Sequence, residues 1–301
     1  MTDGEARDME VGIVAQHDND RAARLAGAMR ASLRRRGVDV RVDRATARTL
    51  GDGDGAAVAD YHECELIVSV GGDGTFLFAA RGAGETPIIG VNLGEVGFLN
   101  ATGPDDAVEA VGAQVSSFED GSLVTREMPR LAVSSETAAL DLDPAVNEAV
   151  VAGPRRGRGG GVDAAVSVDG SRYAAGDADG FIVATPTGST AYNLSEYGPL
   201  VHHDVDGLIL NQMAPAEPMP PLVVDVDSEV VVRVRGDRPA TVVCDGRRSD
   251  PLDPPVEVRI ARAGPPVRIA DAFRVDVPES TLRIENGQLD GELVEDLPVK
   301  I

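Results

Sequence analysis

The sequence is poor in lysine, aromatic residues and cysteine, and it has no long apolar run. Aromatic side chains make up 3% of the residues, with no tryptophan. The two cysteines, Cys64 and Cys244, stand outside any Cys-x-x-Cys or Cys/His pattern, so the spacing favours neither a zinc site nor a disulfide framework, and we expect both to be buried hydrophobic residues. No apolar run reaches the roughly 18 residues of a spanning helix, and the N-terminus lacks the layout of a signal peptide. We therefore expect a cytoplasmic protein that does not enter a membrane.

Positive charge is also scarce. The 28 basic residues include a single lysine, Lys300, and they face 50 acidic residues, which gives a net charge of −22. Such a surface makes nucleic acids and anionic membranes poor partners. An excess of carboxylates with almost no lysine is typical of proteins from cells with molar internal salt, where screening acts over about 3 Å. The composition thus indicates a halophilic protein and says little about its function.

The first part of the chain alternates strand-like and helix-like runs. The expected strands are Val11–Ala15, Val38–Val42, Leu66–Val70 and Pro87–Asn92, and the expected helices are Arg21–Arg36, Phe76–Arg81 and Asp105–Phe118. Strands separated by helices imply a mostly parallel, doubly wound sheet. The sequence therefore predicts an N-terminal α/β domain over residues 1–124.

After Thr125 the pattern changes to short β-rich runs broken by glycine and proline. They are Leu131–Ser134, Ala164–Val168, Phe181–Ala184, Leu208–Leu210, Val223–Val226, Val230–Val234, Ala240–Val243 and Val256–Ile260. These runs predict a second, mainly antiparallel β-rich domain over residues 125–301, whose C-terminal tail can pack back on the first domain. A chain of 301 residues with 43% hydrophobic content is long enough for two such domains.

The first chemical signal is Gly-Gly-Asp-Gly-Thr at 71–75, directly after the strand Leu66–Val70. Glycines let bare backbone N–H groups approach a phosphate chain, and a following helix would aim its N-terminus at the same anion. A carboxylate in such a loop suits a metal ion or an attacking hydroxyl, which makes Asp73 the candidate for chemistry. The alternative is a tight turn that binds nothing.

The second signal is a hydroxyl-rich loop that follows the strand Phe181–Ala184 and precedes a predicted helix. Residues 185–195 contain five serines and threonines. Hydroxyls cap helices, but five exceed what one cap requires, and together with Ala191 and Tyr192 they suit a nucleoside with many polar edges. A third signal, Asn147-Glu148, is compatible on its own with a solvated polar pair.

These segments together resemble a known family. Gly-Gly-Asp-Gly-Thr at 71–75, the Asn-x-Gly-x-x-Gly-Phe-Leu pattern at 92–99, Asn147-Glu148 and Thr-Pro-Thr-Gly-Ser-Thr-Ala-Tyr at 185–192 are similar in order and spacing to the ATP/polyphosphate-dependent NAD kinase family. The first motif alone also resembles diacylglycerol and sphingosine kinases and, more distantly, phosphofructokinases. Four motifs in register favour the NAD kinases.

The resemblance implies a fold and a reaction. It implies an α/β domain followed by a β-rich domain, with the site between them, and transfer of the terminal phosphoryl group of ATP or polyphosphate to the 2′-hydroxyl of the adenosine ribose of NAD. Positioning and charge neutralisation dominate such transfers, so Mg²⁺ or another divalent cation on the donor phosphates is expected, with Asp73 as a possible contact. NAD and ATP would be the small-molecule partners, and a homo-oligomer, a dimer or a tetramer, is implied.

The resemblance also implies site residues. Asp73 would orient or deprotonate the 2′-hydroxyl. The remaining residues divide into a phosphate region, Gly71, Gly72, Gly74 and Thr75; an adenosine and ribose region, Asn147, Glu148, Thr187, Thr190, Ala191, Tyr192 and Ser195; and Asp179 on the nicotinamide side. In the pattern at 92–99, Gly94 and Gly97 would let the chain turn, and Phe98 and Leu99 would anchor the core.

Three further segments allow more than one interpretation. The loop Gly153–Gly161 is either a flexible hairpin or a source of arginines, Arg155, Arg156 and Arg158, for donor phosphates. His202-His203 shows no carboxylate or cysteine partner at ligand spacing, which favours a surface or core role. Asp245-Gly246 matches a family Asp-Gly and equally a hairpin turn.

One segment departs from the family pattern. Residues 211–221 lack the usual Pro-His-Ser-Leu and Arg-Pro motifs, and Ala216 stands where the family has histidine. This departure motivates an alternative function, a non-catalytic regulator that binds NAD(P) or a nucleotide on the same fold. Whether the donor is ATP or polyphosphate, and the acceptor NAD or NADH, stays open at this point.

Overall fold

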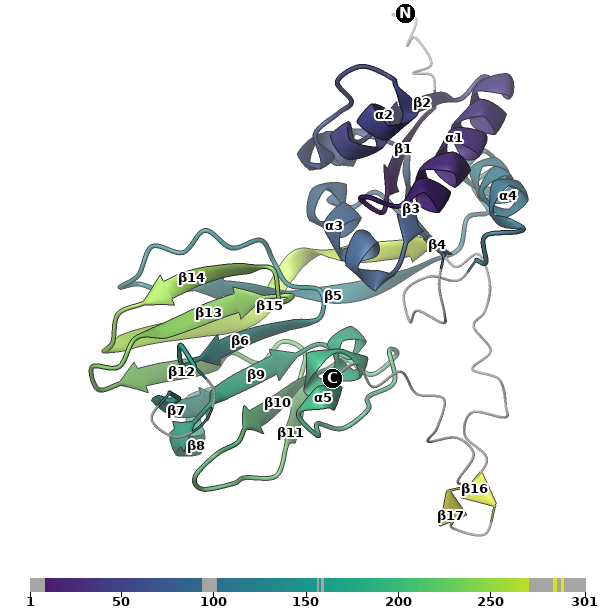
Figure 1. Ribbon diagram of the computed structural model, residues 1–301. Helices are drawn as coiled ribbons and strands as arrows, with labels where there is room; N and C mark the ends of the chain where they lie inside the picture. Colours follow the sequence, from purple (N-terminus) through teal and green to yellow (C-terminus); the bar gives the residue numbers. More distant parts are fainter. Residues whose placement is uncertain are drawn as a thin grey trace, which may run out of the picture.

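Figure 1 shows the computed structural model of the chain. It describes residues 9–93, 102–155, 157 and 160–270, together with two short strands near the C-terminus. Residues 94–101, Arg156 and Arg158 lie outside the described part, so the expectations for Gly94, Gly97, Phe98 and Leu99 and for these two arginines concern residues it does not cover. Within the described residues, no helix has the length and apolarity that crossing a membrane requires.

The elements follow one another along the chain as two distinct sets. The helices are α1 (Asp20–Arg35), α2 (Arg44–Leu50), α3 (Asp73–Ala83), α4 (Ala107–Glu119) and α5 (Tyr192–Ser195), with 3-10 helices η1 (Val58–Glu63) and η2 (Thr187–Thr190). The strands up to the middle of the chain are β1 (Glu10–Ala15), β2 (Asp39–Val42), β3 (Leu66–Gly71), β4 (Ile88–Asn92), β5 (Thr125–Ser134), β6 (Glu148–Ala152), β7 (Val162–Val168) and β8 (Ser171–Ala178). The later strands are β9 (Gly180–Ala184), β10 (Gly207–Met213), β11 (Leu222–Asp225), β12 (Val230–Arg235), β13 (Ala240–Cys244), β14 (Arg248–Leu252), β15 (Val256–Ala270), β16 (Ile284–Glu285) and β17 (Gln288–Leu289).

The N-terminal part is a parallel sheet covered by helices on both faces. Its strands lie in the order β2-β1-β3-β4, all parallel. Alternate residues of β3 point to opposite faces, so Leu66 and Val68 pack in the core that includes α1 and α4, and Ile67 packs in the core that includes α3 and η1. The predicted doubly wound α/β arrangement is confirmed.

The C-terminal part is a β-sandwich. One sheet has the antiparallel order β11-β10-β9-β6-β13-β14. It packs against β12, β7 and β8 through a large core to which β6 and β9 contribute Val151 and Val183. The mainly antiparallel β-rich part is therefore also confirmed. Cys64 and Cys244 are both free and buried, as expected.

Strands β5 and β15 connect the two parts (Figure 1). β15 pairs with β12 in the sandwich and with β5 along its length, and at Ile269 it pairs in parallel with Ile88 of β4. One nine-stranded sheet thus runs through both parts, and Ala270 belongs to the N-terminal core. A division at 124/125 cuts this continuous sheet and stays a prediction of the sequence pattern.

The structure contains elements that the sequence pattern did not predict, among them α2, η1, β6, β8 and β14. α2 has no apolar periodicity and instead begins at Asp43, whose carboxylate accepts the backbone N–H groups of Ala45 and Thr46. The helix predicted from Phe76 begins three residues earlier, at Asp73. Asn211–Met213, which we placed in the departing segment, form the buried end of β10.

Candidate active site

The phosphate loop, Gly71–Thr75, joins the end of β3 to the first turn of α3. Gly71 ends β3 and Gly72 is the N-cap residue of α3, so Asp73 is the first helical residue and not part of an extended loop. A side chain at Gly71 would overlap Thr75, which explains the glycine. Among the described residues no side chain caps α3, and the positive end of the helix dipole at its N-terminus attracts an anion. The geometry suits a phosphate group beside the Asp73 carboxylate.

Asp245 organises the second part of the site. It lies in the turn between β13 and β14 with φ of 51°, and its carboxylate accepts the backbone N–H groups of Val146 (2.9 Å), Asn147 (2.8 Å) and Glu148 (3.2 Å). Its own N–H donates to the Glu148 carbonyl oxygen at 3.0 Å. The turn and the Asn147-Glu148 segment therefore hold each other in place. Burial raises the pKa of Asp245, although these three N–H groups oppose the rise.

Glu148 is a buried carboxylate at the start of β6. Only 5% of its surface is exposed, and it accepts the backbone N–H of Tyr192. Burial, together with the negative charge of Asp245, raises the pKa of Glu148 to about 8. Among the described residues, its Oε2 atom has no hydrogen-bond partner. A buried carboxyl group with a free oxygen is able to receive a ligand hydroxyl.

The hydroxyl-rich loop packs directly on the Asn147-Glu148 segment. Thr185 donates its hydroxyl to the Val146 carbonyl oxygen at 2.6 Å and accepts the Gly188 N–H at 3.1 Å. A side chain at Gly188 would overlap the Asn147 carbonyl group, so the backbones touch here. Two motifs that lie about 40 residues apart in the sequence thus form one unit.

Part of the hydroxyl cluster of this loop serves the backbone of the chain itself. Thr185, Ser189 and Thr190 donate to backbone carbonyl oxygens of the chain itself. The side chains of Thr187, Ala191 and Tyr192 are half-buried, and that of Ser195 is exposed. The irregular backbone of this loop therefore uses three of its hydroxyls as donors, and each of them keeps its oxygen lone pairs as acceptors.

Arg247 joins the two parts of the site. It follows Asp245 in the β13–β14 turn, and its guanidinium donates to the Gly74 carbonyl oxygen of the phosphate loop. One short turn therefore contacts both the phosphate loop and Asn147-Glu148. The structure thus brings together the predicted residues of the phosphate loop, of Asn147-Glu148 and of the hydroxyl-rich loop.

Asp179 lies away from this assembly. It precedes β9, whereas Thr185 follows it, and six residues of extended chain span about 20 Å. Both carboxylate oxygens of Asp179 accept the Gly157 N–H at 2.9 Å, which ties down the hairpin that carries Arg155. Neither Asp179 nor Arg155 is brought to the phosphate loop within one chain.

Four arginines lie near the phosphate loop that the sequence pattern did not indicate. Arg44 and Arg48 of α2, Arg81 of α3 and Arg247 line one cavity with Gly72, Gly74 and Thr75. For Arg247 the sequence signal is the neighbouring Asp245-Gly246, which matches the family and equally a hairpin turn. For the α2 arginines no sequence pattern indicated a role.

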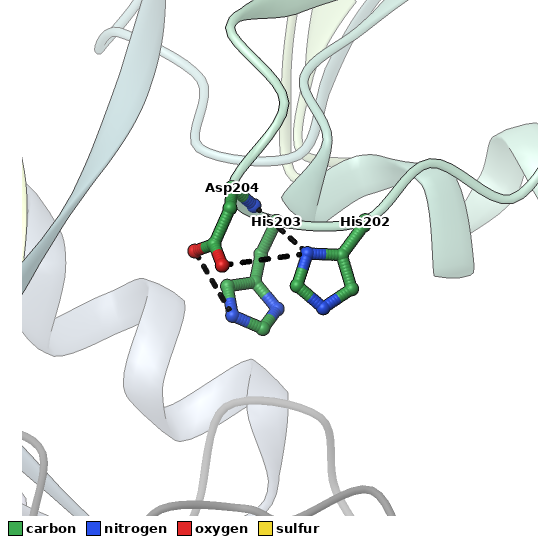
Figure 2. A group of neighbouring side chains, drawn as sticks. All are labelled: His202, His203 and Asp204. Atoms are coloured by element: carbon green, nitrogen blue, oxygen red, sulfur yellow. Dashed lines mark hydrogen bonds and ion pairs between the residues drawn. The ribbon is translucent and has the colours of Figure 1, made fainter.

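His202 and His203 have a carboxylate partner, contrary to the expectation that none lies at ligand spacing. Figure 2 shows both rings turned toward Asp204: His202 Nδ1 lies 3.6 Å and His203 Nε2 3.2 Å from its carboxylate oxygens. Their ligand atoms lie within 4.8 Å of one another, which is close enough for one metal ion. The expectation is therefore wrong, because Asp204, the residue next in sequence, is a carboxylate partner of both histidines.

The fold and the site define a two-domain phosphotransferase with a glycine-rich phosphate loop. Two family models match the chain, the ATP-NAD kinase N-terminal domain over residues 11–116 and the ATP-NAD kinase C-terminal domain over residues 147–271. The NAD kinase of Haloarcula marismortui is 55% identical over 271 residues, covering 87% of this chain and 95% of that protein. The NAD kinase of Halobacterium salinarum is 52% identical, with the same coverage. The chain therefore belongs to the NAD kinase family.

Solved structures agree with this assignment. The crystal structure of an NAD kinase from Archaeoglobus fulgidus in complex with ATP superposes with a TM-score of 0.73 at 28% identity and covers 89% of this chain and 97% of that one. Yeast NADH kinase complexed with NADH, at 19% identity and a TM-score of 0.76, shows the same fold over 92% of this chain and 90% of that one.

Proposed function

We propose that this chain transfers the terminal phosphoryl group of ATP to the 2′-hydroxyl of the adenosine ribose of NAD and so makes NADP. The observation that carries the proposal is the contact between Arg247 and Gly74, which places the phosphate loop beside Asn147, Glu148 and the hydroxyl-rich loop. Curated relatives named NAD kinase and a solved relative that binds ATP support both substrates.

Within this site, Asp73 is proposed to orient the 2′-hydroxyl and to accept its proton. It lies at the N-terminus of α3, where the N–H groups would hold the transferred phosphoryl group. Gly71, Gly72, Gly74 and Thr75 would form the backbone cradle. Because phosphoryl transfer passes through a loose transition state, positioning by these groups matters more than the strength of the base.

The acceptor would bind on the β-rich side. Asn147 and Glu148 are proposed to contact the adenosine and its ribose, because the free Oε2 atom of Glu148 is buried next to the hydroxyl-rich loop. The adenosine pocket would be completed by Thr187, Thr190, Ala191, Tyr192 and Ser195. Asp179 remains a proposed contact for the nicotinamide side, although it lies about 20 Å along β9 from Thr185.

A divalent cation fits this site. Asp73 is a carboxylate at the end of α3 that attracts anions, and a cation between it and the donor phosphates would remove their mutual repulsion. We propose Mg²⁺ on the donor phosphates with Asp73 as its protein ligand, where it would neutralise charge on the transferred group. Activity in molar salt, a cytoplasmic location and a homo-oligomer complete the proposal, and the first of these fits the net charge of −22.

The direct test is NADP formation from NAD and ATP by the purified chain in molar KCl. An NADP-specific dehydrogenase detects the product, and ³¹P NMR identifies the 2′-phosphate. We expect NADP with MgCl₂ and none with excess EDTA. A folded chain that binds NAD but forms no NADP would contradict the proposal and favour the non-catalytic regulator.

A further inference from the structure

His202, His203 and Asp204 form the only group of three metal-ligating side chains in the part of the chain that the structure describes. One ligand atom from each residue lies within 4.8 Å of the other two. The three residues follow one another in the segment between α5 and β10. The lining of the cavity beside the phosphate loop, as far as the structure describes it, includes none of them. The proposed phosphoryl transfer therefore assigns no role to this group.

The distances within the group fit a tetrahedral metal ion. Asp204 Oδ2 lies 3.6 Å from His202 Nδ1, and Asp204 Oδ1 lies 3.2 Å from His203 Nε2 (Figure 2). Zinc–nitrogen bonds of about 2.0–2.1 Å at tetrahedral angles place neighbouring ligand atoms about 3.3 Å apart. The two imidazole rings lie side by side, with centroids 4.1 Å apart and planes tilted by 30°, so both reach the same carboxylate. A metal ion between the three side chains therefore requires only small rotations of them.

One ring nitrogen is already in the form that binds a metal ion. His202 Nδ1 accepts the backbone N–H of Asp204 at 3.3 Å. A ring nitrogen that accepts a hydrogen bond carries a lone pair and no proton, which is the state that metal ligation requires. The same nitrogen faces the Asp204 carboxylate oxygen at 3.6 Å. A cation between these two atoms would replace their mutual repulsion by two attractive contacts.

The backbone of the segment is fixed on both sides of the group. On the N-terminal side, the hydroxyl of the fully buried Ser189 donates to the Val201 carbonyl oxygen at 3.1 Å. On the C-terminal side, the Val205 N–H donates to the His202 carbonyl oxygen at 3.0 Å and closes a turn, and β10 begins at Gly207. A metal ion thus meets ligands whose backbone is already ordered, which lowers the entropic cost of binding.

The ligand types select the class of metal. Imidazole nitrogens suit Zn²⁺, Cu²⁺ and Ni²⁺, whereas Mg²⁺ and Ca²⁺ bind oxygen ligands. The side chains of His202, His203 and Asp204 are 58%, 36% and 70% exposed, so a water molecule has access to a fourth position on the ion. The net charge of −22 also favours the approach of a dication.

We propose that His202, His203 and Asp204 bind one divalent transition-metal ion, represented by Zn²⁺, through two ring nitrogens and one carboxylate oxygen. Water completes the tetrahedral site. This ion differs from the Mg²⁺ proposed on the donor phosphates, because its protein ligands are mainly nitrogen. It fixes the segment that carries Val201, to which Ser189 of the hydroxyl-rich loop is bonded.

The test is a calorimetric titration of the metal-free chain with ZnCl₂ in molar KCl. The chain carries no histidine tag, since a tag binds the same ions, and the salt weakens binding to the many carboxylates. The wild type is compared with His202→Gln/His203→Gln, with Asp204→Asn and with the control His17→Gln. His17 lies 2.7 Å from the Asp18 carboxylate and so has the same kind of partner without a second ring.

We expect the wild type to bind a single Zn²⁺ ion. The Kd should rise at least about tenfold in the double histidine variant and in Asp204→Asn, and should change less than about twofold in His17→Gln. Excess MgCl₂ should leave the Kd for Zn²⁺ within about twofold, because Mg²⁺ prefers oxygen ligands. Thermal unfolding confirms that each variant is folded.

A second measurement locates the ion on the rings. The chain has four histidines, so its imidazole signals in NMR spectra are few. Zn²⁺ should shift the ring signals of His202 and His203 and leave those of His17 and His62 in place. The proposal is overturned if the wild type does not bind Zn²⁺, if the variants bind it like the wild type, or if the two ring signals do not respond. None of these outcomes depends on NADP formation, so this site and the proposed function fail independently.

Discussion

The same strands run between the two ends of the six-stranded sheet, but the polar groups at the two ends differ. At the site end, where β6 begins and β9 ends, the Asp245 carboxylate accepts the Glu148 N–H, and the Thr185 hydroxyl donates to the Val146 carbonyl oxygen. At the hairpin end, a glycine- and arginine-rich loop is tied by the single carboxylate of Asp179. Both ends have motifs of the kind that bind nucleotides, but only the site end meets the phosphate loop. Position along a strand, about 20 Å in this case, decides which motif belongs to the site.

The largest difference between the ends is expected in stability. Asp245→Ala removes the acceptor of three backbone N–H groups at the site end, and Asp179→Ala removes the acceptor of one at the hairpin end. An unsatisfied buried donor costs about 1–3 kcal/mol, and the three donors at Asp245 are part-buried, so we expect a loss of at least about 3 kcal/mol for Asp245→Ala and about 1 kcal/mol or less for the exposed contact of Asp179→Ala. Urea unfolding in molar KCl measures both. Equal losses in the free energy of unfolding would contradict the view that Asp245 stabilises the site end more than Asp179 stabilises the hairpin end.

Glycine substitutions sharpen the same comparison. Gly188→Ala forces a methyl group against the Asn147 carbonyl, and we expect it to cost about 2–3 kcal/mol and to raise the KM for NAD. Gly157→Ala meets nothing within 4 Å and pays only for its φ of +85°, about 1 kcal/mol. Unfolding curves of the two variants provide the measurement. A Gly157→Ala variant as unstable as Gly188→Ala would contradict the description of the site end.

The buried carboxyl group of Glu148 predicts a pH dependence. Its pKa is about 8 in the folded chain and about 4.5 ordinarily, so the folded state keeps a proton that the unfolded chain releases. The contribution of the protonated Glu148 carboxyl to the free energy of unfolding is fully present below pH 4.5 and is lost as the pH rises through 8. Glu148→Gln should therefore raise the Tm relative to the wild type by several degrees more at pH 9 than at pH 5. Calorimetry at both pH values checks this, and an equal difference at both would place the pKa of Glu148 near its ordinary value.

The smallest effect is expected at Asp179. Its carboxylate is already bonded to Gly157, so Asp179→Asn should raise the KM for NAD less than Glu148→Gln does and leave kcat within about twofold. Initial rates at varied NAD concentration distinguish these cases. A loss of kcat as large as that of Glu148→Gln would contradict this ranking.

Features that depend on residues contiguous in the sequence are predicted best. The parallel sheet, the phosphate loop and the resemblance to NAD kinases all rest on short segments whose residues act together. Asp245 was only half recognised, because an Asp-Gly pair in a hairpin has the same sequence whether or not its carboxylate binds Asn147 and Glu148.

Residues that meet only through the fold were missed. Arg44 and Arg48 lie on a helix without apolar periodicity, which depends on its Asp43 cap. Arg81 and Arg247 come close only because the β13–β14 turn reaches the phosphate loop. Conversely, Arg155 was a reasonable candidate by its charge and its place near Glu148 in the sequence, yet β6 carries it away from the site.

The central claim is that phosphoryl transfer takes place at the site end and depends on Asp73. The most direct test compares kcat for NADP formation in the wild type, in Asp73→Asn and in the hairpin-end control Arg155→Gln, with NAD affinity and Tm measured in parallel. The account predicts that Asp73→Asn lowers kcat about 10³-fold while it stays folded and binds NAD, and that Arg155→Gln stays within about twofold of the wild type. An Asp73→Asn variant with a near-normal kcat, or an Arg155→Gln variant that loses as much, would contradict it.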